Sequence, residues 1–522
     1  MTSAQTSFDV IIIGAGHNGL TAGAYLAKAG KRVCIVEQSD VIGGMAQSRE
    51  NAAGIMAPRF AHLAHNFNPA VIKELGLESK VSLKTVPTIY LSPDGRHVDV
   101  TDETISFTDG TPHPDAEAFA QLRARLSRFA GLLSPLALRA PPNLSDGLSL
   151  TGLGELASLA KLGINLRRLG ASDMREFLRI VLSNTYDLIL DDLPDGPLAG
   201  GFAAESIWGA WSGPRSPGTV FSLMYRYGVG TSAQIPQGGM ASLVTALADC
   251  AQHNGADIRT QHRAQSVMVE NDSVTGVTFA DGSVLRAKTV ISSLAPLPTM
   301  HLVGVEHFDT EAVRRVRYVR GKGVTAKINL TTNGLVDIPG LDQRRREGRL
   351  VIAPSAEACE KAFNAAKFGK IPDSPVLEVY SPQVTEESGS TNDHHLLSIN
   401  AQYIPYHLDG GWGDDARARL QERVIDLLST YAPSLRSQLA HAETLTPLDI
   451  EQETGAPGGH WHHCELNTDQ LLTVRPVNGM AHYAYGVDGF YLCGASSHPG
   501  GDVTGLPGRN SAMRLIKEGL PS

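Results

Sequence analysis

The sequence has few cysteines, no excess of positive charge and no long apolar run. Its 5 cysteines stand among 522 residues without a C-x-x-C motif, which argues against a disulfide framework, a zinc site and a dithiol redox centre and favours a reducing compartment. A net charge of −9 gives no polybasic surface, so nucleic acid is not an expected partner. Because no apolar run of about 18 residues and no basic-then-apolar leader occurs, we expect a cytoplasmic protein without a membrane-spanning helix.

The chain does contain a nucleotide-binding pattern at its start. An apolar run at 10–13 predicts a buried parallel strand and leads into G-x-G-x-x-G, formed by Gly14, Gly16 and Gly19. In this motif the first glycine makes a tight turn, the second lets a pyrophosphate approach the backbone, and the third lets the next helix pack closely. A helix is predicted over 20–29.

An acidic residue and a second glycine pair complete this pattern. A second strand is predicted over 32–36, and Glu37 follows it, about 20 residues beyond the glycines, where a carboxylate accepts hydrogen bonds from the adenosine ribose. Gly43 and Gly44 resemble the extended motif of flavoproteins, which passes beside the FAD pyrophosphate. NAD enzymes usually lack this pair, so the pattern favours FAD.

The remaining chain, long enough for about two to four domain-sized units, departs from this βαβ pattern and returns to it. We expect a discontinuous FAD-binding domain at 1–75, 231–299 and 470–522, and a mixed α+β substrate-binding domain at 76–230 and 300–469. Helical patterns at 116–138 and 174–190 indicate a helical lid over about 116–190. Its amphipathic stretch at 141–170 suits weak contact with a membrane surface, or simply the covering of a core.

A second glycine-rich turn lies near the C-terminus. A strand predicted over 489–494 ends on Gly494, and a helix is predicted from 511 onward. A glycine-dense turn before a helix presents free backbone N–H groups, which suit anionic oxygens. We expect this turn, including Asp502, Gly505 and Leu506, to contact a flavin phosphate and the N1/O2 edge of the flavin. Val267, in a strand predicted over 264–270, is a further candidate cofactor contact.

These motifs resemble those of the phytoene-desaturase-like FAD oxidoreductases, most closely the branch named after pyridine nucleotide-disulfide oxidoreductase domain-containing protein 2. The resemblance covers DVIIIGAGHNGL, PQGGM, ISSLAP, GGHWHHCELNTDQLLTVRP and GFYLCGASSHPGGDVTGLPGRNSA. It implies a Rossmann-like FAD-binding domain with the topology of glutathione reductase and amine oxidases, and a substrate bound between the flavin and the second domain. Two positions depart from the family pattern: Met45 replaces a common arginine, and Asp502 replaces an expected glycine.

Imidazole and guanidinium groups gather in the segments expected near the flavin. The substrate-contact candidates are Arg59, Trp461 and His462, and the catalytic candidates are His463, Arg475, His65 and Asp502. Histidine titrates near neutral pH and can move the proton that accompanies hydride transfer. Other interpretations stay open: solvation for Arg59 and His65, turn capping for Asp502, and bracing of the FAD for His463 and Arg475.

The sequence therefore predicts an oxidoreductase with noncovalent FAD and no metal: a dehydrogenase, desaturase or oxidase that exchanges a hydride between flavin N5 and a small organic substrate. Buried cationic groups need polar partners, so we expect a substrate more polar than a carotene. The alternatives are a redox-neutral flavin-dependent isomerase or hydratase acting on a conjugated double bond, and an FAD-binding scaffold without turnover. The electron acceptor (O2, a quinone or a nicotinamide) and the oligomeric state stay open.

Overall fold

The computed structural model describes residues 6–101, 104–141, 160, 163–229, 233–382 and 394–521. Within these residues, one sheet is parallel with the strand order β10-β2-β1-β14-β20. Its strands are β10 Asp257–Arg259, β2 Val33–Val36, β1 Val10–Ile13, β14 Thr289–Ser292 and β20 Phe490–Leu492. β1, β2 and β14 are buried along their whole length, as parallel strands covered on both faces should be. This arrangement confirms the predicted Rossmann-like α/β fold.

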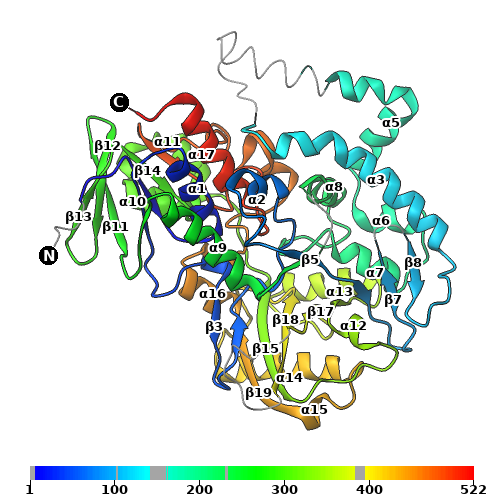
Figure 1. The fold of residues 1–522 in the computed structure, drawn as a ribbon. Coiled ribbons are helices and arrows are strands. Elements are labelled where there is room, and N and C mark those ends of the chain that lie inside the picture. Colours follow the sequence, from blue (N-terminus) through cyan, green and yellow to red (C-terminus); the bar gives the residue numbers. More distant parts are fainter. Residues whose placement is uncertain are drawn as a thin grey trace.

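Alternate residues of these strands pack against different layers. One face packs on α1 His17–Lys28, α9 Gly239–His253 and α17 Leu506–Glu518, which lie together in Figure 1. The close approach depends on glycine, because an added Cβ at Gly23 would lie 2.4 Å from Ile35 Cδ1. The other face packs on the meander β11 Ala264–Glu270, β12 Ser273–Phe279 and β13 Val284–Arg286, and on α10 Pro296–Val303 and α11 Thr310–Arg317.

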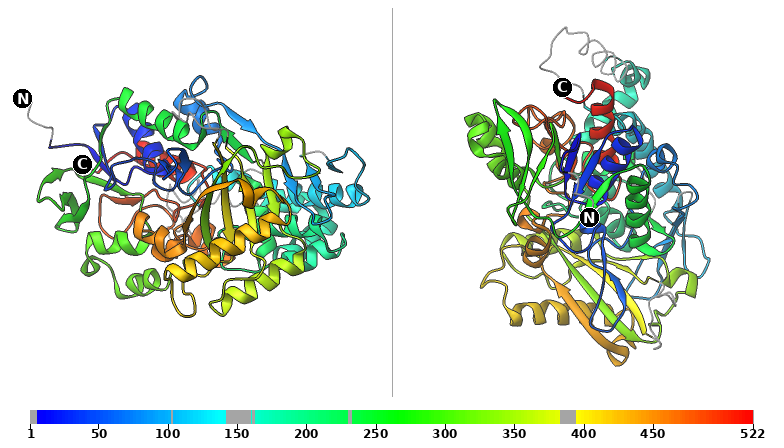
Figure 2. Two further views of the ribbon diagram at one scale, coloured as in Figure 1. Left: turned by 90° about the horizontal axis from the view of Figure 1, so that it is seen from below. Right: turned by 60° about the vertical axis from the view of Figure 1, so that its left-hand side comes forward.

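A second, mixed sheet has the order β19-β15-β18-β17-β16-β6-β7-β8. Its strands are β19 Leu439–Leu445, β15 Thr325–Asn333, β18 His394–Gln402, β17 Val376–Tyr380, β16 Arg349–Ile352, β6 Thr88–Tyr90, β7 Val98–Val100 and β8 Ile105–Phe107. Its apolar face packs on α14 Asp414–Ser429 and α15 Leu435–Gln438 (Figure 2). Because side chains alternate along a strand, the opposite face carries Lys327, Glu378 and Asn400, all of them buried.

Helices form a block beside this sheet. They are α3 Ala116–Ala137, α5 Gly170–Val181, α6 Thr185–Leu190, α7 Pro197–Ala204 and α8 Thr219–Val229. The prediction of one helix over 174–190 is wrong, because Asn184 accepts a hydrogen bond from the backbone N–H of Asp187 and starts a new helix there. The amphipathic stretch 141–170 falls largely outside the described residues. Among those residues, no helix is both long and apolar enough to cross a membrane.

Several other elements connect these layers. They are β3 Ser48–Glu50, β4 Met56–Pro58, α2 Pro69–Leu75, β5 Leu83–Thr85, β9 Gln234–Pro236, α12 Gln343–Arg346, α13 Ala356–Lys367 and α16 Pro447–Thr454. Helix α17 begins at Leu506 rather than at residue 511, because Pro507 is tolerated in a first helical turn. The division into two discontinuous domains at residues 75, 230, 299 and 469 stays a prediction.

Candidate functional site

The loops that follow β1, β2 and β14 line a cavity of about 400 Å³, which we call the glycine-loop cavity. The first glycine turn contributes Gly14 and Gly16, the end of β2 contributes Glu37, and the second glycine pair contributes Gly44. Met45 lines the cavity beside Gly44, and segments distant in sequence add His262, Arg263, Ala264, Trp461, His463 and Ala495. A cavity of this size is within the usual range for a cofactor site.

The three glycines of the first turn have different surroundings. An added Cβ at Gly14 would lie 2.2 Å from Ser293 Oγ, and one at Gly19 would lie 2.0 Å from the carbonyl oxygen of Gly14. At Gly16 the nearest atom, Gly44 Cα, would be 3.9 Å away. The protein itself therefore leaves room for a side chain at Gly16, which fits a backbone kept bare for a ligand.

Glu37 is held in place by the backbone of the same cavity. Its carboxylate accepts hydrogen bonds from the N–H of Ala15 and the N–H of Ser39, each at 2.9 Å. A carboxylate has about four acceptor positions, so two remain for hydroxyl groups of a ligand.

His17, Met45 and Trp461 line both the glycine-loop cavity and a smaller space of about 70 Å³, the inner cavity. His17 Nε2 and Trp461 Nε1 are buried without a hydrogen-bond partner among the described residues. Burial lowers the pKa of His17 to about 4, so its imidazole is neutral at physiological pH. Two orphaned polar atoms at the junction of two cavities fit a polar ligand that passes from one cavity to the other.

The floor of the inner cavity is a hydrogen-bonded network on the polar face of the mixed sheet. His62 Nδ1 lies 3.0 Å from Lys327 Nζ, and His62 Nε2 lies 3.0 Å from Glu378 Oε1. Because the ammonium can only donate, Nδ1 accepts and Nε2 carries the proton that is donated to Glu378. Asn400 donates to Glu378 at 3.0 Å and accepts from Lys327 at 3.2 Å.

Burial and charge set the protonation of this network. Desolvation lowers the pKa of Lys327 to about 7, although Glu378 opposes the shift. Desolvation and the nearby ammonium lower the pKa of His62 to about 4. Burial by itself raises the pKa of Glu378, but Arg349 and His62 outweigh it and hold that pKa well below its ordinary value. At neutral pH the floor therefore contains a carboxylate, a neutral imidazole and an amine close to its midpoint.

The opposite wall of the inner cavity comes from the two C-terminal segments. The N–H of Asp502 donates to His462 Nδ1 at 3.1 Å, so His462 Nε2 carries the proton and is buried without a partner among the described residues. Desolvation lowers the pKa of His462 to about 3. Although burial opposes it, Arg226 at 3.3 Å keeps the pKa of Asp502 below its ordinary value.

His65 and Arg226 also line a third space of about 310 Å³, the outer cavity. His65 Nε2 lies 3.3 Å from Glu378 Oε2, so it extends the polar floor. The three cavities thus form a series, from the glycine-loop cavity through the inner cavity to the outer cavity, in which each neighbouring pair shares lining residues.

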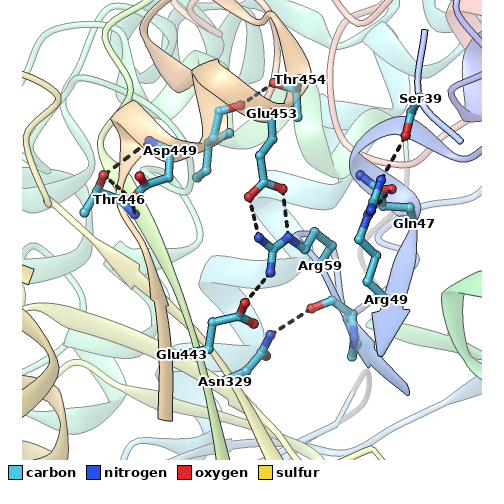
Figure 3. A network of polar contacts seen from close by, with 12 residues as sticks. Ser39, Gln47, Arg49, Arg59, Asn329, Glu443, Thr446, Asp449, Glu453 and Thr454 are labelled. Carbon is cyan, nitrogen blue, oxygen red and sulfur yellow. Dashed lines mark hydrogen bonds and ion pairs between the residues drawn. The ribbon is translucent and has the colours of Figure 1, made fainter. Parts of the chain in front are cut away.

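The structure places two of the predicted site residues away from the inner cavity. Arg59 binds Glu453 and, at 2.5 Å, Glu443 (Figure 3). It lines none of the three cavities. His463 lines the glycine-loop cavity rather than the inner one, and desolvation lowers its pKa to about 3. These positions do not support substrate contact by Arg59 or proton transfer by His463.

Arg475 is fully buried and its guanidinium binds backbone oxygens. Its two terminal nitrogens donate to the carbonyls of Glu465, Gln470, His462 and Ala495 at 2.6 to 3.0 Å. This geometry ties the 462–470 segment to the C-terminal turn and favours the bracing alternative over the catalytic role predicted for Arg475.

The predicted cofactor contacts at Val267, Gly494, Gly505 and Leu506 line none of the three cavities. Val267 belongs to the core between the parallel sheet and the meander, and residues 262–264 line the glycine-loop cavity instead. An added Cβ at Gly494 would lie 2.2 Å from the carbonyl oxygen of Ser293, so that glycine serves close backbone packing. Gly505 is the left-handed cap that starts α17.

Sequence reasoning missed Lys327, Glu378 and Asn400. A signal was present: Lys327 stands in TAKINL and Glu378 in VLEVY, each a charged residue inside an otherwise apolar strand. A charge is seldom buried without a partner or a function, so this pattern indicates a buried polar site at both residues.

This fold, with a glycine-lined cavity at the carboxyl ends of parallel strands, is the arrangement typical of dinucleotide-binding α/β proteins. The chain matches the family of flavin-containing amine oxidoreductases over residues 19–508 and belongs to that family.

Its 5 cysteines are buried and free, and burial raises the pKa of each thiol.

Named relatives agree with this assignment. Pyridine nucleotide-disulfide oxidoreductase domain-containing protein 2 of Rattus norvegicus is 29% identical, over 98% of this chain and 94% of its own. A lycopene-forming phytoene desaturase of Pseudescherichia vulneris is 23% identical, over 95% and 96%. The structure of cyclohexylamine oxidase from Brevibacterium oxydans matches with a TM-score of 0.59 at 15% identity, over 98% and 99%. The predicted resemblance to desaturase-like flavoproteins is thereby confirmed.

Proposed function

We propose that this protein binds FAD noncovalently in the glycine-loop cavity and exchanges a hydride between the flavin and an organic substrate in the inner cavity. The observation that carries the proposal is the junction at His17, Met45 and Trp461, where a cavity suited to a dinucleotide meets one floored by buried polar groups. Membership of a flavin-containing oxidoreductase family supports it.

Residues of the glycine-loop cavity would hold the cofactor. The bare backbone at Gly16 would receive the pyrophosphate, and Glu37 would accept hydrogen bonds from the ribose. His463, which lines this cavity with Nδ1 unpartnered among the described residues, would contact the cofactor rather than the substrate. Bound FAD supplies hydride acceptance and donation, while the protein supplies orientation, charge and exclusion of water.

Residues of the inner cavity and its floor would orient the substrate and exchange a proton. His462 Nε2–H would donate to a polar substrate atom and orient it. Lys327 Nζ is linked to the cavity through His62 and Asn400, and its pKa of about 7 lets it gain or lose a proton near neutral pH. We assign Lys327 as a positioning and proton-storing residue that acts through His62.

The walls of the inner cavity favour a compact, polar reacting group. A carotene would place a methyl-branched hydrocarbon chain against the unpartnered Nε2–H of His462, and leaving such a buried donor unpaired costs on the order of 1–3 kcal/mol. The substrate we propose therefore presents a hydroxyl, carbonyl or similar oxygen at the reacting end.

Anaerobic stopped-flow mixing with candidate substrates tests the proposal. A hydride donor should bleach the flavin in a single turnover, and an electron acceptor should restore it. Product formation without net bleaching would indicate the isomerase or hydratase alternative, and the absence of turnover with every donor would indicate a scaffold.

A further inference from the structure

The outer cavity has an unbalanced set of charges. Four arginines line it, Arg123, Arg226, Arg344 and Arg349, whereas Glu205 is its one lining carboxylate among the described residues. Such an imbalance in a cavity attracts anions and repels cations.

At the inner end of the outer cavity, carboxylates of the protein neutralise two of these arginines. Arg349 binds Glu205 at 2.5 Å and Glu378 at 2.6 Å, and Arg226 pairs with Asp502 at 3.3 Å. These two guanidiniums are committed to carboxylates and therefore add little net charge there.

The outer end carries Arg344 and Arg123. Arg344 is exposed on the short helix α12 and forms no ion pair with a residue that the structure describes. Arg123, on α3, donates to the carbonyl oxygen of Thr101 at 2.5 Å. Arg344 therefore presents an available guanidinium fork at the mouth of the cavity.

The outer cavity also has apolar and aromatic lining residues. They are Tyr90, Phe119, Phe202, Leu223 and Tyr227. A space of about 310 Å³ with such walls accommodates a short hydrocarbon or aromatic body.

We infer that the substrate is an amphipathic carboxylate: its polar reacting end enters the inner cavity, its apolar body fills the outer cavity, and its carboxylate binds Arg344 at the mouth. The inference rests on the proposed function, since it names the substrate class of that site. A guanidinium fork matches a carboxylate in two parallel hydrogen bonds. An alkylammonium of the same shape would meet the Arg344 guanidinium, with which it can form neither an ion pair nor a hydrogen bond, and would bind poorly.

Calorimetric titration of the FAD-loaded protein with three probes of one shape tests this inference: 4-phenylbutyrate, its methyl ester and 4-phenylbutylamine. We expect the acid to bind at least about tenfold more tightly than the ester or the amine, and added salt to weaken the acid alone. Arg344→Gln should weaken binding of the acid by about tenfold and leave the ester unchanged.

A matched control is Arg314→Gln, which removes an arginine of 65% side-chain exposure on α11 and should change affinity for the acid by less than about twofold. Equal binding of acid and ester, preference for the amine, or full affinity in Arg344→Gln would each overturn the inference. Because calorimetry needs no turnover, a catalytically inactive protein that still prefers the acid would refute the proposed function alone.

Discussion

Replacing Gly16 by alanine should weaken FAD binding while leaving the fold intact. The backbone at Gly16 has φ −69° and ψ 167°, which alanine adopts freely. An added Cβ would lie 3.9 Å from its nearest neighbour, Gly44 Cα, an ordinary van der Waals distance. Losing glycine at a helix N-cap costs about 0.5–1 kcal/mol, and the lower entropy of the unfolded chain returns about 0.4–1 kcal/mol. The net change in the stability of the apoprotein should therefore be close to zero.

The same methyl group should interfere with the cofactor. Inserting one carbon into a filled site costs about 1–3 kcal/mol, so FAD should bind about 5-fold to 150-fold more weakly. The assay is a fluorescence titration of apoprotein with FAD, alongside urea unfolding of the apoprotein. Apoproteins must be compared because bound FAD would itself stabilise the fold.

Two variants provide controls. Gly19→Ala places its Cβ 2.0 Å from the carbonyl oxygen of Gly14 and should destabilise the fold itself. Gly131→Ala, inside α3 with no neighbour within 4 Å, should raise stability by about 0.5–1 kcal/mol and leave FAD affinity unchanged. A folded Gly16→Ala protein with full FAD affinity would refute the placement of the pyrophosphate.

Three further outcomes are expected. Glu37→Ala should weaken FAD binding by about one to two orders of magnitude through lost charge-assisted hydrogen bonds; unchanged affinity in the same titration would count against the ribose contact. Lys327→Met should flatten the pH dependence of stability: between pH 7 and 10 the unfolded chain holds a proton that the folded Lys327 lacks, so the wild-type protein should gain up to about 1.4 kcal/mol per pH unit relative to the variant. Urea unfolding at pH 7.5 and 9.5 measures this, and an equal change in the free energy of unfolding of the two proteins would contradict the prediction. His463→Ala should lower FAD content more than it slows flavin reduction in the FAD-loaded fraction. Full FAD content with lost flavin reduction would instead support a catalytic role for His463.

The elements that local sequence determines could be predicted well. Strand Val10–Ile13 has the predicted bounds, because an apolar β-branched run before a glycine turn needs no distant partner to be recognised. The glycine turn could also be recognised, because its motif is local in the sequence.

The polar floor of the inner cavity could not be predicted in this way. His62, Lys327, Glu378 and Asn400 come from one loop and three strands, and the pairing of those strands brings them together. Arg475 shows the same limit, because its four carbonyl partners are set by the path of two loops rather than by spacing in the chain.

The visible spectrum of the purified protein, recorded before and after acid precipitation, tests the central claim most directly. We expect flavin absorption bands in the native protein, and FAD in the supernatant after precipitation, because no covalent link is proposed. A colourless protein that takes up no added FAD, or a flavin that stays with the precipitate, would contradict the account.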